Sequence, residues 1–491
     1  MYTLQIFQNG KETKVHLDAP QKLQVLLQEN GFQQDHPCGG RGTCRKCKVL
    51  LEGMVSAPNG TERQAGHRLS CQAQILGDAR VWLQDSRESR IQLSGGEIAQ
   101  VQAAAGIGAA VDIGTTTLAL KLYDLQKGKV LAECAAMNPQ RSISADVMGR
   151  IGAALAGQAR QLKMLVCQAV EALLEQACAM AAIQKAQVVS MVVAGNTTML
   201  YLLTGTDPEP LSHAPFAADC LFGMDSQLFG IPVYYPPCMN AFVGADITCA
   251  VIAAGMHRSG EISLLCDIGT NGELALWKNG RLYVTSTAAG PAFEGAGISC
   301  GCGSVEGAID KVWLDGETVR IHTIGDKKPV GICGSGLIDA IAVFLETERI
   351  DETGAAEEDS MALAGPVTLL PQDVRAIQLA KAAIAAGIQM LLEISGTREE
   401  EVACLYIAGG FGSHLNVNSA AAIGLIPEGL AQRVKTLGNA ALTGAASILL
   451  NPGKMAEIHA LAQKSVHVSL GGDPLFNSLF MENMLFGQDA L

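Results

Sequence analysis

The sequence predicts a multidomain protein of the α+β and α/β classes, with a small N-terminal domain and a larger domain built from two lobes. Three observations lead to this prediction. A loop rich in cysteine and glycine lies within a strand–helix–strand pattern before residue 84. An apolar strand followed by Asp, Gly and Thr occurs twice, at 110–120 and 265–276. The chain has 491 residues, too many for one hydrophobic core, so two to four domains are expected.

The composition narrows the class of protein further. Hydrophobic residues make up 48% of the chain and glycine occurs 54 times, which suits close packing of helices on sheets. The net charge of −13 argues against a nucleic-acid partner. The fifteen cysteines are scattered, and we find no signal peptide, so we expect a reducing, cytoplasmic setting without disulfides. We find no apolar run of membrane-spanning length, so we expect no membrane partner.

The N-terminal residues follow the element order of a β-grasp domain. Residues 2–7 alternate in polarity, Asn9-Gly10 offers a hairpin turn, and the alternation resumes at 15–17. Residues 23–28 have leucines at helical spacing, and 48–52 form another strand pattern. We therefore predict a β-grasp ferredoxin-like fold over residues 1–84.

Four cysteines give this domain its chemistry. The spacing C-x5-C-x2-C with a later fourth cysteine is close to the plant-type ferredoxin pattern, which holds a [2Fe–2S] cluster. Glycines in the loop let backbone amides approach the cluster sulfurs. A structural zinc site is the alternative, but it would usually pair two C-x2-C knuckles and only one is present. We therefore predict the four cluster ligands to be Cys38, Cys44, Cys47 and Cys71.

The larger domain is predicted from the repeated strand pattern. Residues 85–108 lack a strong period and are interpreted as a partly helical linker. We place the larger domain at 109–491, with lobe 1 over about 109–255 and lobe 2 over about 256–491. The C-terminal part of lobe 2 can return to lobe 1.

Each repeat can wrap around a phosphate. Its glycine permits close backbone approach, while threonine hydroxyls and amides donate to phosphate oxygens. An Asp at the end of the strand can hold Mg²⁺ through water. The candidates in the first repeat are Asp112, Gly114, Thr115, Thr116 and Thr117, and those in the second are Asp267, Gly269, Thr270 and Asn271.

Further glycine turns complete the predicted nucleotide site. The strand at 404–408 runs into a glycine-rich turn that can lie flat against an adenosine, with candidates Gly409, Gly410 and Gly412. Residues 331–340 form a strand-to-helix turn with candidates Gly334, Ser335 and Gly336. Residues 188–199 enter a polar Asn-Thr-Thr turn, and 241–255 form a helix pattern of small residues.

The motifs D112-I-G-T-T-T, D267-I-G-T-N-G-E and I407-A-G-G-F-G together resemble the phosphate-1, phosphate-2 and adenosine motifs of the actin, Hsc70 and sugar-kinase superfamily. The resemblance implies a two-lobed, RNase H-like ATPase that binds ATP and Mg²⁺, with 241–255 as a connecting helix. Asp112 and Asp267 would orient Mg²⁺ or the attacking water. Asp246 is a further candidate for positioning water, and an aspartate on a helix surface is the alternative.

The whole chain resembles the ATP-dependent reductive activators of corrinoid proteins. The stretches 194–199, 287–301 and 331–340 are similar to segments of that family. The resemblance implies one-electron reduction of inactive Co(II) to Co(I) in the corrinoid protein of an anaerobic methyltransferase system. It also implies an upstream low-potential electron donor, and it allows a homodimer. Longer members carry a middle segment after the linker, and because Asp112 follows the ferredoxin-like domain closely, we expect that segment to be missing.

The resemblance also implies that ATP is needed to drive the reduction of cobalt. A plant-type cluster has a reduction potential near about −400 mV. In a one-electron transfer each shortfall of ~59 mV costs about 1.4 kcal/mol, so the cluster alone leaves cobalt reduction uphill. ATP would open and close the lobes and so change how the protein binds the corrinoid protein. ATP can shift the equilibrium between the open and closed states only by the difference in its affinity for them.

Two other functions stay open at this point. The chain could activate another low-potential enzyme of the radical dehydratase type, although such activators hold a [4Fe–4S] cluster between subunits. It could also be a nucleotide-gated chaperone whose cluster senses redox state. A sugar kinase is disfavoured because the cluster would have no task.

Several further residues are interpreted as structural. Cys300, Cys302 and Cys333 are predicted to be buried thiols rather than a second metal site. His36, His213 and His414 are predicted to be surface residues. The acidic run at 352–359 is predicted to be a solvated loop, and the apolar stretch at 374–394 a core helix.

Overall fold

The structure is a computed structural model. It describes residues 2–32, 34, 36, 40–42, 46–65, 67–83, 93, 98, 101–410 and 414–487. Its internal contacts divide the chain into two compact units. The first comprises Met1–Glu88, Asn138–Cys167 and Leu202–Ser212, and the second comprises Ser89–Met137, Gln168–Tyr201 and His213–Leu491. Most of the predicted linker lies outside the described residues, and the predicted domain boundaries stay predictions.

The N-terminal part of the first unit is a mixed sheet covered by one helix. Asn9 and Gly10 take positive φ angles of 50° and 72° and close the hairpin predicted there. The sheet order is β2-β1-β6-β4-β5, with β3 paired to β6, and β1 runs parallel to β6. The leucines of α1 pack on the sheet in a core with Leu4 and Ile6, which confirms the predicted β-grasp fold. The elements are β1 (Tyr2–Gln8), β2 (Lys11–Leu17), β3 (Gln21–Lys22), α1 (Leu23–Glu29), β4 (Lys48–Val55), α2 (Gly60–Ala65), β5 (Arg68–Leu69) and β6 (Gln74–Trp82).

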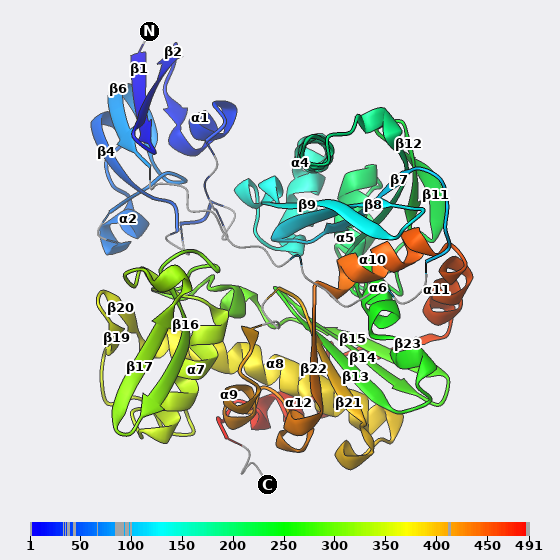
Figure 1. Cartoon of the computed structure of the whole chain (residues 1–491). Helices are drawn as coiled ribbons and strands as arrows, with labels where there is room; N and C mark the ends of the chain where they lie inside the picture. Colours follow the sequence, from blue (N-terminus) through cyan, green and yellow to red (C-terminus); the bar gives the residue numbers. More distant parts are fainter. Residues whose placement is uncertain are drawn as a thin grey trace. The chain divides into compact units, whose positions relative to one another are not determined.

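The second unit contains two six-stranded sheets with the same internal plan (Figure 1). In the first sheet, β7, β8 and β9 form an antiparallel meander and β10 lies parallel to β7; its order is β11-β12-β10-β7-β8-β9. In the second, β13, β14 and β15 form the meander and β21 lies parallel to β13; its order is β22-β21-β13-β14-β15-β23. The internal repeat predicted from the sequence is therefore a repeated sheet.

These strands have the following bounds. The first sheet comprises β7 (Ile107–Ile113), β8 (Thr117–Asp124), β9 (Lys129–Met137), β10 (Val188–Gly195), β11 (Met224–Leu228) and β12 (Ile231–Tyr235). The second comprises β13 (Ser263–Ile268), β14 (Gly272–Lys278), β15 (Arg281–Thr287), β21 (Cys404–Ala408), β22 (Val434–Gly438) and β23 (Ser465–His467).

Two helices of small residues share one core with both sheets. Helix α6 (Ala245–Ala254) lies within the predicted 241–255 helix, and α10 (Ala440–Leu450) follows β22. Their buried side chains pack with Ala110 of the first sheet and Leu265 of the second. A Cβ atom on Gly444 of α10 would lie 2.0 Å from the carbonyl oxygen of Cys249, so only glycine allows this close crossing.

A second core surrounds α7 (Gly334–Glu346) and α8 (Pro371–Ser395), with the small sheet of β16–β18 against α7. Helix α8 confirms the predicted core helix at 374–394. By length and composition it could also span a membrane, which corrects the expectation that no apolar run is long enough. However, 78% of its most apolar stretch is buried within the protein, as in a core helix.

The remaining helices and strands are α3 (Val147–Ala153), α4 (Ala159–Met180), α5 (Thr197–Thr204), β16 (Ala308–Asp315), β17 (Thr318–Thr323), β18 (Gly331–Ile332), β19 (Met361–Ala364), β20 (Val367–Leu369), α9 (Val417–Ala422), α11 (Lys454–Gln463) and α12 (Pro474–Glu482). Short 3₁₀ or π turns connect several of them.

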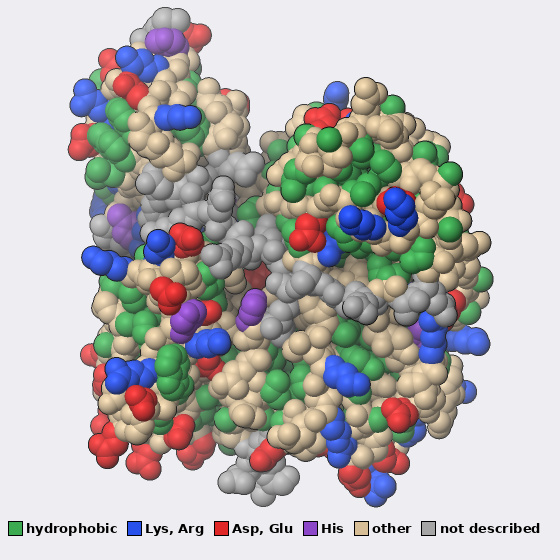
Figure 2. All heavy atoms as spheres, in the orientation of Figure 1, with side chains coloured by type: hydrophobic (Ala, Val, Ile, Leu, Met, Phe, Trp, Pro, Cys, Tyr) green, Lys and Arg blue, Asp and Glu red, His purple; other side chains and the backbone are tan. Residues whose placement is uncertain are grey.

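Charged side chains are mixed over the visible surface. On the face in Figure 2, lysine and arginine stand among acidic side chains, and acidic side chains gather near β17 and β19. The predicted solvated loop at 352–359 is mostly exposed. The described residues on this face thus form no continuous basic surface of the kind that nucleic acids select.

Candidate functional site: a thiol loop and a two-hairpin carboxylate site

The thiols of Cys47 and Cys71 lie side by side in the N-terminal domain. Their Sγ atoms are 3.3 Å apart, and both side chains are buried. The hydrogen bond between Cys47 and Cys71, together with the nearby His36, holds the pKa of Cys47 well below its usual range, against the effect of burial. Cys38 and Cys44 lie outside the described residues. Two adjacent buried thiols, one of which has a lowered pKa, fit a metal–sulfur cluster, so the donor chemistry supports Cys47 and Cys71 as ligands.

Glycines shape the loop around these thiols. Gly40 and Gly42 take φ angles of 78° and 80°, which L-residues rarely adopt. The side-chain amide of Gln72 donates to the carbonyl of Gly40 at 2.6 Å and contacts the sulfur of Cys71 at 3.6 Å. The described glycines therefore have the backbone conformation for which the sequence selects glycine.

His36 is buried, so the prediction for this residue is wrong. It was predicted to be a surface residue, but only 2% of it is exposed. Its Nε2 lies 3.3 Å from the Ser70 hydroxyl, and its buried Nδ1 has no hydrogen-bond partner among the described residues. His36 contacts Ser70, which lies 34 positions further along the chain, and local sequence cannot show a contact of this kind. His213 and His414 are exposed, as predicted.

In the second unit, the two repeated hairpins place their aspartates at matching positions. Asp112 follows the buried residues of β7, and Asp267 occupies the same place in β13. The turns are closed by backbone bonds from Gly114 to Thr117 at 2.9 Å and from Gly269 to Asn271 at 3.0 Å. Each hairpin thus presents a carboxylate beside a glycine–threonine turn.

Burial raises the pKa values of three aspartates of the site, and neighbouring carboxylates add to the rise at two of them. Burial and the charges of Asp112 and Glu294 raise the pKa of Asp267 to about 7. Burial, with Asp267 and Asp112, raises the pKa of Asp246 to about 7, and burial raises that of Asp112 to about 6. No Lys or Arg among the described residues contributes to these shifts. We call this group the carboxylate cluster: Asp112, Asp246, Asp267, Glu273 and Glu294.

A group of buried carboxylates close to one another is stabilised when a cation binds. Its members influence one another, yet among the described residues no three metal-ligating side chains converge closely enough to hold a metal ion directly. Mg²⁺ usually keeps several waters and binds through phosphates with one or two carboxylates. The cluster therefore fits Mg²⁺ held through water together with a nucleotide. Asp246, with its partly buried carboxylate, belongs to this group rather than to an outward helix face.

Asparagines hold two of the predicted residues in place. Asn439 donates to the Asp112 carboxylate at 2.9 Å, and its own side-chain oxygen caps α10 by accepting from the amide of Leu442. Asn196 donates to the Thr115 hydroxyl at 3.0 Å and caps the turn into α5. The helix caps thus double as supports for the first hairpin.

Glu294 joins the two hairpins. Its Oε2 accepts from the Thr116 hydroxyl at 2.9 Å and from the Thr270 hydroxyl at 3.0 Å. In the second turn, the side chain of Asn271 hydrogen-bonds Glu273, whose pKa is raised well above its ordinary value by burial and by Asp246 and Asp267. The predicted threonines therefore meet around an acid that the sequence analysis did not select.

Of the three glycines predicted to contact adenosine, Gly409 lies next to the carboxylate cluster. Gly409 ends β21 with φ of 92°, and a Cβ there would lie 2.7 Å from Oδ1 of Asp267. Gly410 is exposed, and Gly412 lies outside the described residues. Gly334, Ser335 and Gly336 form the buried first turn of α7.

Packing explains part of that helical turn. The Ser335 hydroxyl donates to the carbonyl of Asp310 at 3.0 Å. A Cβ on Gly336 would lie 2.3 Å from the carbonyl oxygen of Ile309. The assignment of these three residues to the nucleotide site stays a prediction.

Four residues of the site were not predicted from the sequence: Asn196, Glu273, Glu294 and Asn439. Three of them lie within stretches already quoted for other reasons. Asn439 carries the signal of a helix N-cap, because it stands between a strand and a run of small helical residues. Cys333 is buried and contacts the Ser335 hydroxyl at 3.4 Å, while Cys300 and Cys302 are partly buried.

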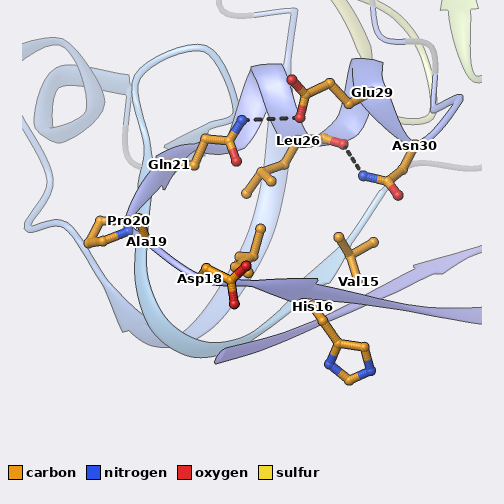
Figure 3. Close-up of a pocket in the computed structure, with 10 residues that line it drawn as sticks. Val15, His16, Asp18, Ala19, Pro20, Gln21, Leu26, Glu29 and Asn30 are labelled. Carbon is orange, nitrogen blue, oxygen red and sulfur yellow. Dashed lines mark hydrogen bonds between the residues drawn. The ribbon is translucent and has the colours of Figure 1, made fainter. Parts of the chain in front are cut away.

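A groove of about 540 Å³ lies in the N-terminal domain between β2 and α1 (Figure 3). Gln21 donates to Glu29 across one side of it, and Asn30 donates to the carbonyl of Leu26. None of the predicted site residues lines this groove, so we assign it no role.

Comparison with known proteins identifies three regions of the chain. The 2Fe-2S iron-sulfur cluster binding domain family matches residues 6–76. The RACo middle region matches residues 107–259, and the C-terminal domain of RACo, the ASKHA domain, matches residues 261–491. The match at 107–259 corrects the expectation that a middle segment is missing, because this region is the segment that we assigned to lobe 1.

Individual relatives span most of the chain. The corrinoid activation enzyme RamQ of Eubacterium limosum is 34% identical over 78% of this chain and 71% of its own. The [Co(II) methylated amine-specific corrinoid protein] reductase of Methanosarcina barkeri is 25% identical over 76% of each chain. The solved structure of a reductive activator for corrinoid, iron-sulfur protein superposes with a TM-score of 0.73 at 26% identity, over 99% of this chain and 98% of the other.

The fold is thus confirmed as a [2Fe–2S] ferredoxin domain joined to an ASKHA ATPase domain. With its three matched regions and a relative of this identity and coverage, the chain belongs to the RACo family of corrinoid-protein reductive activators.

Proposed function

We propose that this protein reduces the inactive Co(II) form of a corrinoid protein to Co(I) and couples this step to ATP hydrolysis. One observation carries the proposal: a buried thiol pair suited to an iron–sulfur cluster and a two-hairpin carboxylate site occur on one chain. The relatives with the same domains are named for corrinoid activation and corrinoid reduction.

The energetics explain the need for both sites. The cluster, when bound, supplies one electron per turnover at a potential near about −400 mV. If cobalt reduction requires a lower potential, each ~59 mV must be offset by about 1.4 kcal/mol. Binding and hydrolysis of ATP can supply this only through a different affinity of the open and closed forms for the partner.

The residues of this chain then have separate tasks. Cys38, Cys44, Cys47 and Cys71 would bind the cluster. Asp112 and Asp267 would hold Mg²⁺ through water, and Asp246 would orient the attacking water. The phosphates and adenosine would contact Gly114, Thr115, Thr116, Thr117, Gly269, Thr270, Asn271, Gly334, Ser335, Gly336, Gly409, Gly410 and Gly412.

The partners follow from the electron balance. One electron leaves the cluster for cobalt, so a low-potential donor must reload the cluster before the next turnover. The corrinoid protein is the acceptor. A cytoplasmic location agrees with these reduced thiols, and a homodimer is compatible with the proposal but is not needed for it.

The experiment mixes the dithionite-reduced protein with a Co(II) corrinoid protein and follows the Co(I) absorption band with and without Mg·ATP. We expect Co(I) to form only with ATP. Substitutions Cys44→Ser and Cys71→Ser should remove the cluster's EPR signal and Co(I) formation together. Equal Co(I) formation without ATP, or by the cluster-free variants, would refute the proposal.

A further inference from the structure

Glu294 connects two turns that are distant in sequence. Thr116 lies in the turn of the β7–β8 hairpin, and Thr270 lies in that of β13–β14. Both hydroxyls donate to the same carboxylate oxygen, Oε2 of Glu294, at 2.9 and 3.0 Å. A single side chain of the second lobe therefore ties together the two hairpins that the proposed function assigns to phosphate binding.

The backbone holds Glu294 firmly at this point. It ends a short 3₁₀ turn, Pro291–Glu294, whose Phe293 and Ala292 are buried in the lobe 2 core. The next residue, Gly295, has φ of 74°, and a Cβ there would lie 2.4 Å from the carbonyl oxygen of Cys302. Because this turn is anchored on both sides, the carboxylate is presented to the hairpins by the fold itself.

Each threonine hydroxyl can donate to Glu294 or to a phosphate, but not to both. A threonine hydroxyl has one hydrogen, so it cannot donate to Glu294 and to a phosphate oxygen at the same time. A carboxylate and a phosphate also repel each other at short range. The γ-phosphate of ATP and the carboxylate of Glu294 must therefore compete for the same two hydroxyls.

We propose that Glu294 is a specificity-determining residue that holds the Thr116 and Thr270 hydroxyls in the nucleotide-free protein and releases them to a γ-phosphate. The inference rests on the nucleotide site of the proposed function. It adds the reason why this site responds to a triphosphate: ADP has no group that displaces the carboxylate. Release of Glu294 breaks the tie between the hairpins when ATP arrives, and loss of the γ-phosphate restores it.

The test measures nucleotide binding by calorimetry on the full chain with Mg²⁺, using the non-hydrolysable analogue AMP-PNP and ADP. In Glu294→Gln the competing charge is gone, so the dissociation constant for AMP-PNP should fall about tenfold, while that for ADP should change less than about threefold. Glu317→Gln, which removes one exposed carboxylate from the β16–β17 turn, should change neither.

A second substitution tests whether the hydroxyls donate to the γ-phosphate once Glu294 no longer holds them. In the Glu294→Gln background, Thr270→Val should raise the dissociation constant for AMP-PNP again, because the γ-phosphate loses a donor. Equal shifts for AMP-PNP and ADP, or weaker AMP-PNP binding by Glu294→Gln, would overturn the exchange while leaving the ATP site intact. Failure of the unaltered protein to bind either nucleotide would overturn the ATP site itself and the exchange with it.

Discussion

The β7–β8 and β13–β14 hairpins, which we propose to bind phosphate, have the same plan but different electrostatic surroundings. Burial raises the pKa of Asp112 in the first to about 6, and a hydrogen bond from the Asn439 amide limits this rise. Asp267 in the second receives no hydrogen bond from any described residue and lies near Asp112 and Glu294, so burial and these charges raise its pKa to about 7. The repeat thus supplies one carboxylate with a hydrogen-bond donor and one without a donor among the described residues.

This difference suggests a division of labour. A carboxylate that already has a donor is held in place and contributes mainly to positioning. A buried carboxylate without a donor gains most when Mg²⁺ or an ordered water arrives. We therefore expect the second hairpin to control turnover and the first to control geometry.

The largest expected effect separates the two aspartates. Asp267→Asn should lower partner-stimulated ATP hydrolysis by about 10³-fold, because the cation and the attacking water lose their least compensated ligand. Asp112→Asn should lower it by only about 10-fold to 100-fold on the same scale. Steady-state phosphate release measures both variants, and equal losses would show that the hairpins are equivalent.

A glycine next to Asp267 should be the next most sensitive position. Gly409→Ala places a Cβ 2.7 Å from Oδ1 of Asp267 at a φ of 92°. The backbone strain alone should lower the free energy of unfolding by about 1–3 kcal/mol, and the displaced carboxylate should weaken Mg·ATP binding.

Gly280→Ala provides the matched control for that substitution. Gly280 has a similar φ of 81°, but open space surrounds the position of its Cβ. It should lose stability from strain while keeping its affinity for Mg·ATP. If chemical denaturation and calorimetry show the same changes for both variants, contact with Asp267 has no separate effect.

The raised pKa of Asp267 predicts a pH-dependent stability. As pH rises from about 4 to about 7, an unfolded carboxyl loses its proton before the folded one does, so nucleotide-free protein loses stability through this group. Asp267→Asn should remove that loss and raise the free energy of unfolding by about 2 kcal/mol at pH 8, with a smaller gain at pH 5. Thermal unfolding at both pH values measures the difference, and saturating Mg·ATP should reduce it. A gain that is independent of pH would contradict the assignment.

The smallest expected effect concerns the support of Asp112. Asn439→Ala and Asn416→Ala each remove a helix N-cap and should each cost about 1 kcal/mol of stability. Only Asn439→Ala should also weaken Mg·ATP binding, because Asp112 loses its donor. Equal nucleotide affinity in the two variants would remove Asn439 from the site.

Much of this arrangement could be predicted from the sequence. Local patterns predicted the ferredoxin elements, both hairpins and the two aspartates, because strand alternation, the Asn-Gly turn and the two Asp-Ile-Gly-Thr turns are short-range signals. Glu294 and the burial of His36 could not be predicted, since each depends on the return of a distant segment. The electrostatic difference between the hairpins depends on Asn439, which lies 327 positions from Asp112.

The most direct test measures cobalt reduction by an Asp267→Asn protein whose cluster is shown by EPR to be intact and reduced. With Mg·ATP and a Co(II) corrinoid protein, we predict that the Co(I) band fails to develop, although the unaltered protein produces it under the same conditions. Formation of Co(I) at the normal rate by this variant would contradict the central claim that the second hairpin couples nucleotide to electron transfer.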